Sequence, residues 1–311
     1  MKALLIVPLA VLAAALGFLI AGCGADEATP AGPVPSVEEE SETATEPVET
    51  ITEEEGEGET GSGEGEGEPS GTVTYQVWFA EGETLFVTYR SQERTPRVGT
   101  AALEALLRGP DEFEQGYGLS SAIPEGTQLL GLRIEDGIAY VDLTSELESG
   151  GGTLSMQMRL AQVVFTLAQF PTVEGVLFSL DGEQVDVIGG EGIVVDQPLH
   201  RRDFRDLLPA ILVTSPALGQ TVGNPVLIRG SANVFEANVS VEVLDASGQE
   251  IASTFTTATC GTGCRGTFAV SLEYEVDEEQ DGMLVVHDDD AAGTGTYPHE
   301  VRIPVRLTPG A

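Results

Sequence analysis

An acidic, low-complexity stretch from residue 24 to residue 70 decides where this chain can fold. It contains 16 acidic residues and no lysine or arginine, and the rest is mostly glycine, threonine, serine and proline. Such a segment cannot bury enough apolar surface to offset the conformational entropy that folding removes. We therefore expect a disordered acidic linker over residues 23–70 and a folded part that begins near residue 71.

The N-terminus carries the pattern of a secretory signal. Lys2 precedes an unbroken apolar run over residues 3–20, and the small residues Ala21 and Gly22 follow, next to Cys23. The ending Ile-Ala-Gly-Cys resembles the lipobox of bacterial lipoproteins. The resemblance implies a signal peptide over residues 1–22 and lipidation of Cys23, which would anchor the chain to the extracytoplasmic face of the cell membrane. The alternative is an uncleaved anchor with an incidental cysteine, since the run is at the short edge of what spans a bilayer.

The balance of charge excludes two kinds of contact. The chain has 51 acidic and 14 basic residues, a formal net charge of −37. A surface this acidic repels nucleic acid, because phosphate binding requires clustered lysine and arginine side chains. It also repels anionic lipid headgroups, so we expect the acyl chains on Cys23 to be the membrane contact. The charge suits either a polyanion-rich envelope or a cationic partner.

Residues 71–200 alternate between strand and helix patterns. Thr100 is placed to cap a helix that ends at Gly109 and Pro110, and a longer helix begins at Thr153 and ends before Pro171. The order of elements predicts an α+β domain, an antiparallel sheet with the two helices on one face. The strands are predicted over residues 73–79, 84–90, 129–134, 138–143 and 173–180, with turns at 81–83 and 135–137, a loop to residue 126, and buried helix positions at Leu160, Val163, Val164, Leu167 and Ala168.

Six short motifs lie within residues 72–190: VWF at 77–79, LLRGP at 106–110, IPEGT at 123–127, DGIAYVDL at 136–143, TLAQFP at 166–171, and Val176 before Asp181-Gly182. In this combination the stretch resembles the sporulation and spore germination (GerMN) family. The resemblance implies an envelope module without a generally accepted catalytic activity. The residues themselves indicate structural roles: Gly109-Pro110 stops a helix, Asp181-Gly182 forms a turn, and Asp142 bonds to local backbone.

Residues 210–308 lose the helical periodicity. Seven short β-rich runs in about 100 residues predict a β-sandwich, and residues 203–209 are then a short interdomain joint. The runs are 211–214, 226–231, 239–244, 251–256, 266–272, 282–287 and 300–307. Ser215-Pro216, GSA at 230–232, FEANV at 235–239 and GTF at 266–268 resemble the immunoglobulin-like domain of bacterial spore germination.

Cys260 and Cys264 remain once Cys23 is assigned to lipid. An exported compartment allows disulfides, and the glycines between these two residues let a short loop close, so we predict a bridge. The chain-entropy model gives such a small loop about 2 kcal/mol, enough to fix a hairpin tip. A redox pair or half of a metal site are the alternatives. The spacing is not Cys-x-x-Cys, and a zinc site needs four ligands where the chain offers three separated histidines.

Motifs for catalysis or cofactors are weak. G-x-G-x-x-G occurs at 56–61 and at 261–266, but neither follows a strand and opens a helix. Glu146 and Glu148, after Asp142, could form a carboxylate pair for wall hydrolysis, although 51 carboxylates produce such clusters by chance. The acidic run 287–290 could hold calcium, but solvated loop acids explain it more simply.

These observations predict a non-enzymatic binding or scaffold lipoprotein without cofactor, facing a cell-wall polymer or an envelope protein. The family names suggest a link to sporulation, germination or wall remodelling. The alternative is a binding protein for a small ligand or wall fragment with its pocket between the domains. A wall hydrolase is the weakest alternative.

Overall fold

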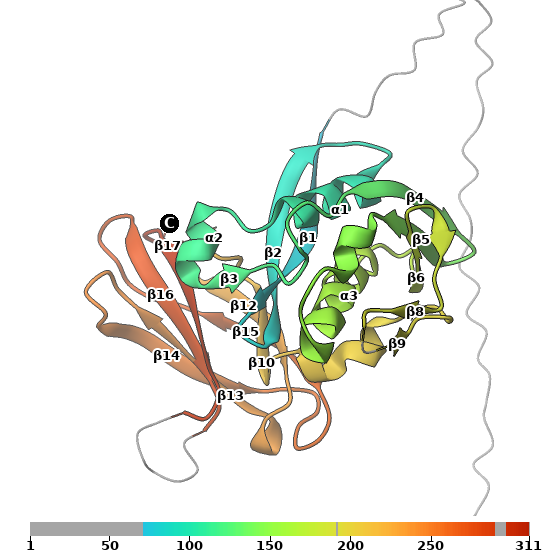
Figure 1. Cartoon of the computed structure of the whole chain (residues 1–311). Helices are drawn as coiled ribbons and strands as arrows, with labels where there is room; N and C mark the ends of the chain where they lie inside the picture. Colours follow the sequence, from blue (N-terminus) through green and yellow to red (C-terminus); the bar gives the residue numbers. More distant parts are fainter. Residues whose placement is uncertain (1–70, 191, 290–296, 311) are drawn as a thin grey trace, which may run out of the picture. The chain divides into compact units, whose positions relative to one another are not determined.

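An α+β domain is followed by an immunoglobulin-like β-sandwich, which confirms the predicted fold class (Figure 1). The computed structural model describes residues 71–190, 192–289 and 297–310. The signal peptide, Cys23 and the acidic linker lie outside the described residues. Within the described ranges, no helix is long and apolar enough to cross a bilayer.

The first domain contains two sheets around one long helix, and β8 and β9 form a separate two-stranded sheet. One sheet has the order β2-β1-β3 and the other the order β4-β5-β6-β7, while α1 and α3 pack against each other and against β1. Its elements are β1 (Thr72–Glu81), β2 (Thr84–Glu93), α1 (Val98–Arg108), α2 (Glu112–Tyr117), β3 (Leu119–Ser120), β4 (Leu129–Glu135), β5 (Ile138–Leu143), η1 (Ser145–Glu148), α3 (Thr153–Leu167), β6 (Gly175–Leu180), β7 (Glu183–Gln184), β8 (Val187–Ile188), β9 (Ile193–Val194) and η2 (Arg201–Leu207).

The sequence predicts one mostly antiparallel sheet, whereas β2-β1-β3 and β4-β5-β6-β7 form separate sheets. β1 and β2 pair antiparallel over their whole length, but β5 and β6 pair parallel, with α3 as the crossover between them. Helix α3 is therefore covered on several sides, and nearly every residue from Met156 to Leu167 is buried. The predicted apolar face is part of that burial, except that Ala168 follows the last helical residue and is half-buried.

Two local boundaries differ from the sequence prediction. Helix α1 begins at Val98 and has no side-chain cap, so Thr100 lies inside it. The extra residues are held by packing, because Gly99 is buried against Leu132 and Leu167. The predicted loop after Pro110 contains α2, which starts with a capping box between Asp111 and Glu114.

Two of the three predicted turns of the first domain have the type I′ geometry that hairpins prefer. Asp136 and Gly137 have φ of 50° and 81°, and Asp181 and Gly182 have φ of 50° and 84°. Positive φ at both central residues gives a type I′ turn, whose twist matches that of the flanking strands. These turns set the β4–β5 and β6–β7 registers.

The second domain is a two-sheet sandwich in which each of the seven predicted strands is present. The sheets have the orders β10-β12-β15 and β11-β17-β16-β13-β14, and the strands alternate buried and exposed residues. The elements are β10 (Ile211–Ser215), β11 (Thr221–Val222), β12 (Val226–Ala232), η3 (Phe235–Ala237), β13 (Asn238–Leu244), β14 (Glu250–Thr257), β15 (Gly266–Leu272), β16 (Gln280–His287) and β17 (Glu300–Leu307).

The predicted disulfide between Cys260 and Cys264 is present, with the two Cα atoms 5.7 Å apart. Its place differs from the prediction. The bridge lies between β14 and β15, which belong to different sheets, so it closes a crossover loop rather than a hairpin tip. The loop lies against the segment after β12, because Thr262 N donates to Val234 O (2.9 Å) and Gly263 N to Asn233 Oδ1 (3.0 Å).

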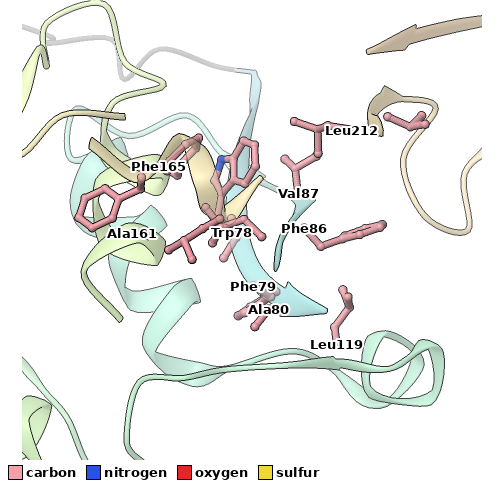
Figure 2. Packing of buried hydrophobic residues seen from close by; sticks show 14 of the residues in the cluster. Trp78, Phe79, Ala80, Phe86, Val87, Leu119, Ala161, Phe165 and Leu212 are labelled. Carbon is pink, nitrogen blue, oxygen red and sulfur yellow. The ribbon is translucent and has the colours of Figure 1, made fainter. Parts of the chain in front are cut away.

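The two domains share one interface within the compact unit Glu64–Ala311. The joint between them is the ordered 3₁₀ helix η2, whose Phe204 and Leu207 are buried. Figure 2 shows Leu212 of β10 directed toward Val87 of β2, and both belong to one continuous apolar cluster that includes residues of both domains. The sequence domains are therefore joined by a shared core rather than by a free linker.

Candidate functional site

A groove of about 1030 Å³ lies between the two domains and is the candidate site. The first domain contributes residues of β1, α3 and η2, and the second contributes β10, β12, the disulfide loop and the start of β15. Its lining includes four arginines, Arg201, Arg202, Arg205 and Arg265, and one carboxylate, Asp206, among the described residues. Four of the chain's 14 basic residues thus gather in one place of a protein with net charge −37.

Arg201 forms the floor of the groove together with two aromatic rings. Its guanidinium carbon lies 5.0 Å from the centre of the Phe165 ring and 5.5 Å from that of Trp78, within the range of cation–π attraction. The centres of the two rings are 4.8 Å apart, and both residues are labelled in Figure 2. Arg201 Nη2 donates to Phe165 O (2.6 Å), a carbonyl in the last turn of α3, where the helix dipole favours a cation.

The charge of Arg201 is only partly compensated. Its Nε atom is buried and has no hydrogen-bond partner among the described residues, and no described carboxylate forms a salt bridge with it. Burial lowers the pKa of the Arg201 guanidinium to about 10. The side chain therefore remains a cation at neutral pH.

Arg265 faces the groove from the second domain, directly after the disulfide. Its Nη1 donates to the backbone and hydroxyl oxygens of Ser231 (3.2 Å each), and its Nη2 donates to Pro209 O. Burial lowers the pKa of this arginine as well. Among the described residues it too has no carboxylate partner, so two backbone carbonyls and the Ser231 hydroxyl hold this cation.

The comparisons with known proteins divide the chain at the same place. Residues 67–186 match the family model Germane, described as "Sporulation and spore germination". Residues 210–294 match Gmad2, the "Immunoglobulin-like domain of bacterial spore germination". The chain carries a Germane domain followed by a Gmad2 domain. This order is the one that the sequence resemblance predicted.

Solved structures give distant similarities. The first GerMN domain of the sporulation protein GerM from Bacillus subtilis is 19% identical, with a TM-score of 0.35, and the match covers 42% of this chain and 99% of that one. The tandem GerMN domains of the same protein are 11% identical, with a TM-score of 0.37, covering 76% of this chain and 61% of that one. The search of curated proteins returned no match.

One motif of the Germane domain holds in place the strand β1, which carries Trp78 of the groove. Strand β1 pairs with β3 only at Ala80 and Glu81, so the rest of that edge needs other partners. Helix α3 provides them: Gln162 Nε2 donates to Trp78 O (3.0 Å) and Trp78 N donates to Thr166 Oγ1 (3.2 Å). The buried polar face of α3 thereby fixes the strand that carries Trp78.

Gln169 continues this pairing along β1. It accepts from Gln76 N (2.6 Å) and donates to Gln76 O (2.7 Å), as a neighbouring strand would. Gln76 in turn accepts from the Trp78 indole N–H (3.3 Å). The TLAQFP motif of the Germane domain therefore supplies hydrogen-bond partners for the edge of β1.

The carboxylates considered for wall hydrolysis do not converge. Asp142 Oδ1 accepts from Gly182 N (3.0 Å), which holds the β6–β7 turn, and Glu148 Oε1 accepts from Gly189 N (2.6 Å). Glu146 and Glu148 are exposed on η1, away from the groove lining. Their observed contacts are structural.

The acidic run 287–290 of the Gmad2 domain is engaged by protein groups in its described part. Asp288 is 6% exposed and accepts from His299 Nδ1 (2.7 Å) and His299 N (3.0 Å), while Asp289 accepts from Asn238 (3.0 Å). Asp290 lies outside the described residues. In the described ranges no group of three or more His, Cys, Asp or Glu side chains could hold a metal ion.

Sequence reasoning missed the arginine cluster. Arg201, Arg202 and Arg205 fall in the stretch near the predicted joint, and Arg265 follows 60 residues later, so no local pattern joins them. One signal was available: the triplet of arginines within five residues contrasts with the acidic composition of the chain. The second G-x-G-x-x-G match, 261–266, spans the disulfide loop and ends at the first residue of β15, so it opens no helix.

Proposed function

We propose that this chain is a non-enzymatic binding module of the bacterial cell envelope, and that the interdomain groove is where it binds. The groove itself carries the proposal. Ligand sites are typically concave, lie at domain interfaces and combine apolar walls with a few polar groups. This groove is concave and lies at a domain interface, although its lining is richer in polar groups, and the domain interface that forms it is bonded and packed before any ligand arrives.

We further propose that a lipid on Cys23 holds the module at the extracytoplasmic face of the cell membrane. The lipobox resemblance and the secretory pattern over residues 1–22 support this anchor. The acidic linker would then keep the domains away from the bilayer, since like-charged side chains repel anionic headgroups. The descriptions of the two family models support a role in sporulation, germination or wall remodelling.

Two experiments test the proposal. The full-length chain is expressed with its own N-terminus and fractionated beside the variant Cys23→Ala. The anchor requires that the first chain pellets with membranes and that the variant does not. Equal pelleting of both would overturn the lipid anchor.

Binding is tested by co-sedimentation of the purified full-length chain, in non-ionic detergent, with cell-wall sacculi at low and at high salt. The expected result is saturable pelleting with the sacculi. A chain that stays in the supernatant under both conditions would reject a wall partner and favour an envelope protein, which cross-linking in intact cells would then identify.

A small ligand or wall fragment remains the second candidate for the same groove. Its volume, about 1030 Å³, lies at the upper end of the range for small-molecule sites, roughly 300–1,000 Å³. Competition by soluble wall fragments in the sedimentation assay separates a fragment-binding site from one that needs the intact polymer.

A further inference from the structure

The groove holds positive charge that the protein does not neutralise. Among the described residues, Arg201 and Arg265 have no carboxylate partner, and Arg205 has neither an ion pair nor a side-chain hydrogen bond. Elsewhere in the described chain, carboxylates bind some arginines, such as Arg90 and Arg306, within 2.6–2.8 Å, while others, such as Arg159, have no carboxylate partner either. The groove is distinguished because it brings three arginines without a carboxylate partner together in one concave site, where an external anion can reach them.

Partial burial makes Arg201 and Arg265 more effective as a binding site, whereas Arg205 is exposed at the groove. A guanidinium that is desolvated and lacks a counter-ion gains more from an incoming oxyanion than an exposed one does, because water screens it less. Arg201 is fixed beforehand by the Phe165 carbonyl and the two aromatic rings. Its Nε–H is unpaired but buried, so forked pairing with a carboxylate or phosphate through this atom requires the groups that cover it to move.

The remaining lining suits a hydroxyl-rich ligand. Gln76, Thr214, Ser231, Asn233 and Thr267 bring amide and hydroxyl groups, which can both donate and accept hydrogen bonds. Sugar hydroxyls need partners of this kind. The groove thus combines a few cations with many neutral polar groups, instead of the dense basic surface that a nucleic acid requires.

We propose that the groove binds an anionic glycan, a sugar polymer that carries carboxylate or phosphate groups. Its oxyanions pair with Arg201, Arg205 and Arg265, and its hydroxyls bond to the neutral polar side chains around them. This inference rests on the proposed function, because it names the ligand class of the same groove. The acidic remainder of the protein confines the polymer to the groove, since the rest of the surface repels it.

The single tryptophan of the chain provides a direct readout. Trp78 lies under Arg201 at the floor of the groove, so an oxyanion that moves or neutralises this guanidinium changes the tryptophan fluorescence. The full-length chain is titrated with three polymers on one backbone: dextran, carboxymethyl dextran and dextran phosphate. Calorimetry on the same samples gives the affinity independently of the optical signal.

The expected result is binding of the charged dextrans, an optical change at Trp78, and no binding of plain dextran. Arg205→Gln and Arg265→Gln should each weaken binding by about ten-fold or more, because each removes a charge-assisted contact. Arg133→Gln is the matched control, since Arg133 is exposed on β4 and outside the groove lining. Arg205→Gln disturbs no described side-chain contact, so its effect is not one of misfolding. Raising the salt from about 0.05 M to about 0.5 M should also weaken binding.

Other outcomes overturn the inference, and they differ from failure of the proposed function. If the chain pellets with sacculi but binds neither charged dextran, the proposal of an envelope-binding module is retained and the anionic-glycan site is rejected. Equal losses in Arg205→Gln and Arg133→Gln would also reject the site. A glutamate-rich peptide with the sequence of residues 53–68 serves as a rival ligand. If it binds while the dextrans do not, the groove takes acidic protein segments instead.

Discussion

Tyr89 of β2 donates a hydrogen bond of 2.5 Å to the backbone carbonyl of Thr214 on β10, across the boundary between the Germane and Gmad2 domains. A second bond, from Tyr117 Oη to Arg302 O (2.6 Å), joins the domains on another side, and the Phe113 ring lies directly against Gly219. These contacts hold the walls of the groove at a fixed separation. A site that is already formed loses less entropy when its ligand binds.

The two interdomain tyrosines should stabilise the protein and hold the groove at a constant width. We expect Tyr89→Phe and Tyr117→Phe each to lower the free energy of unfolding by about 1 kcal/mol, since each leaves a carbonyl without its donor. Denaturant unfolding of the full-length chain measures this. Tyr140→Phe is the control, because the Tyr140 ring stacks on Arg133 and its hydroxyl has no hydrogen bond in the described part of the chain. Indistinguishable losses in all three variants would contradict the interdomain role.

Stability at alkaline pH should depend on Tyr117. Burial, and to a smaller degree the nearby Glu81, raises the pKa of Tyr117 in the folded protein. In the unfolded chain the Tyr117 hydroxyl ionises near pH 10, while in the folded protein it stays neutral. The stability that this difference contributes is therefore complete below about pH 10 and is lost as the pH rises above that value. Tyr117→Phe should therefore show a shallower fall of stability between about pH 9 and pH 11.

The comparison of wild type with Tyr117→Phe is essential to that measurement. Arg201 acts in the opposite direction, because its folded pKa of about 10 lies below that of the unfolded chain, and stability from this group rises with pH above 10. The difference between the two proteins removes the arginine contribution. Parallel pH profiles would show that Tyr117 does not ionise differently in the two states.

Gln162 should be among the most sensitive polar positions of the Germane domain. It is fully buried, donates to Trp78 O (3.0 Å) and accepts from Ala122 N (2.8 Å). Gln162→Met keeps the approximate shape but leaves two buried backbone groups unpaired, so we expect a loss of roughly 2–4 kcal/mol. Chemical denaturation measures it against Gln197→Met, an exposed position whose side chain, among the described residues, bonds only to the Asp196 carbonyl, where the change should be negligible.

The disulfide should matter more for the groove than for global stability. The double variant Cys260→Ser/Cys264→Ser is expected to lose about 2 kcal/mol, because the closed loop is short. Hydrogen exchange should increase in residues 261–265, the loop that carries Arg265, and the affinity for charged dextran should fall. Cys23→Ala is the control, since it removes a cysteine and leaves the bridge intact. Unchanged exchange in the loop would show that the hydrogen bonds to Asn233 and Val234 fix it without the bridge.

Several local features of this protein are determined by short stretches of its sequence. The Asp136-Gly137 and Asp181-Gly182 turns, the stop of α1 at Gly109, the seven strands of the Gmad2 domain and the Cys260–Cys264 bridge each depend on residues close together in the chain. Backbone preferences and side-chain alternation act over a few residues, and so they can be read without knowing the fold.

The tertiary structure decided what depends on residues far apart. Helix α1 starts earlier than predicted because Gly99 packs against Leu132 and Leu167. The strands expected in one sheet form two, and one of these contains the parallel β5–β6 pair. The groove also depends on the tertiary structure, because Arg201 and Arg265 line one groove only when the two domains pack together. Charge at a site is a sum over neighbours in space, and in this chain that sum is positive in the groove although the sequence as a whole is acidic.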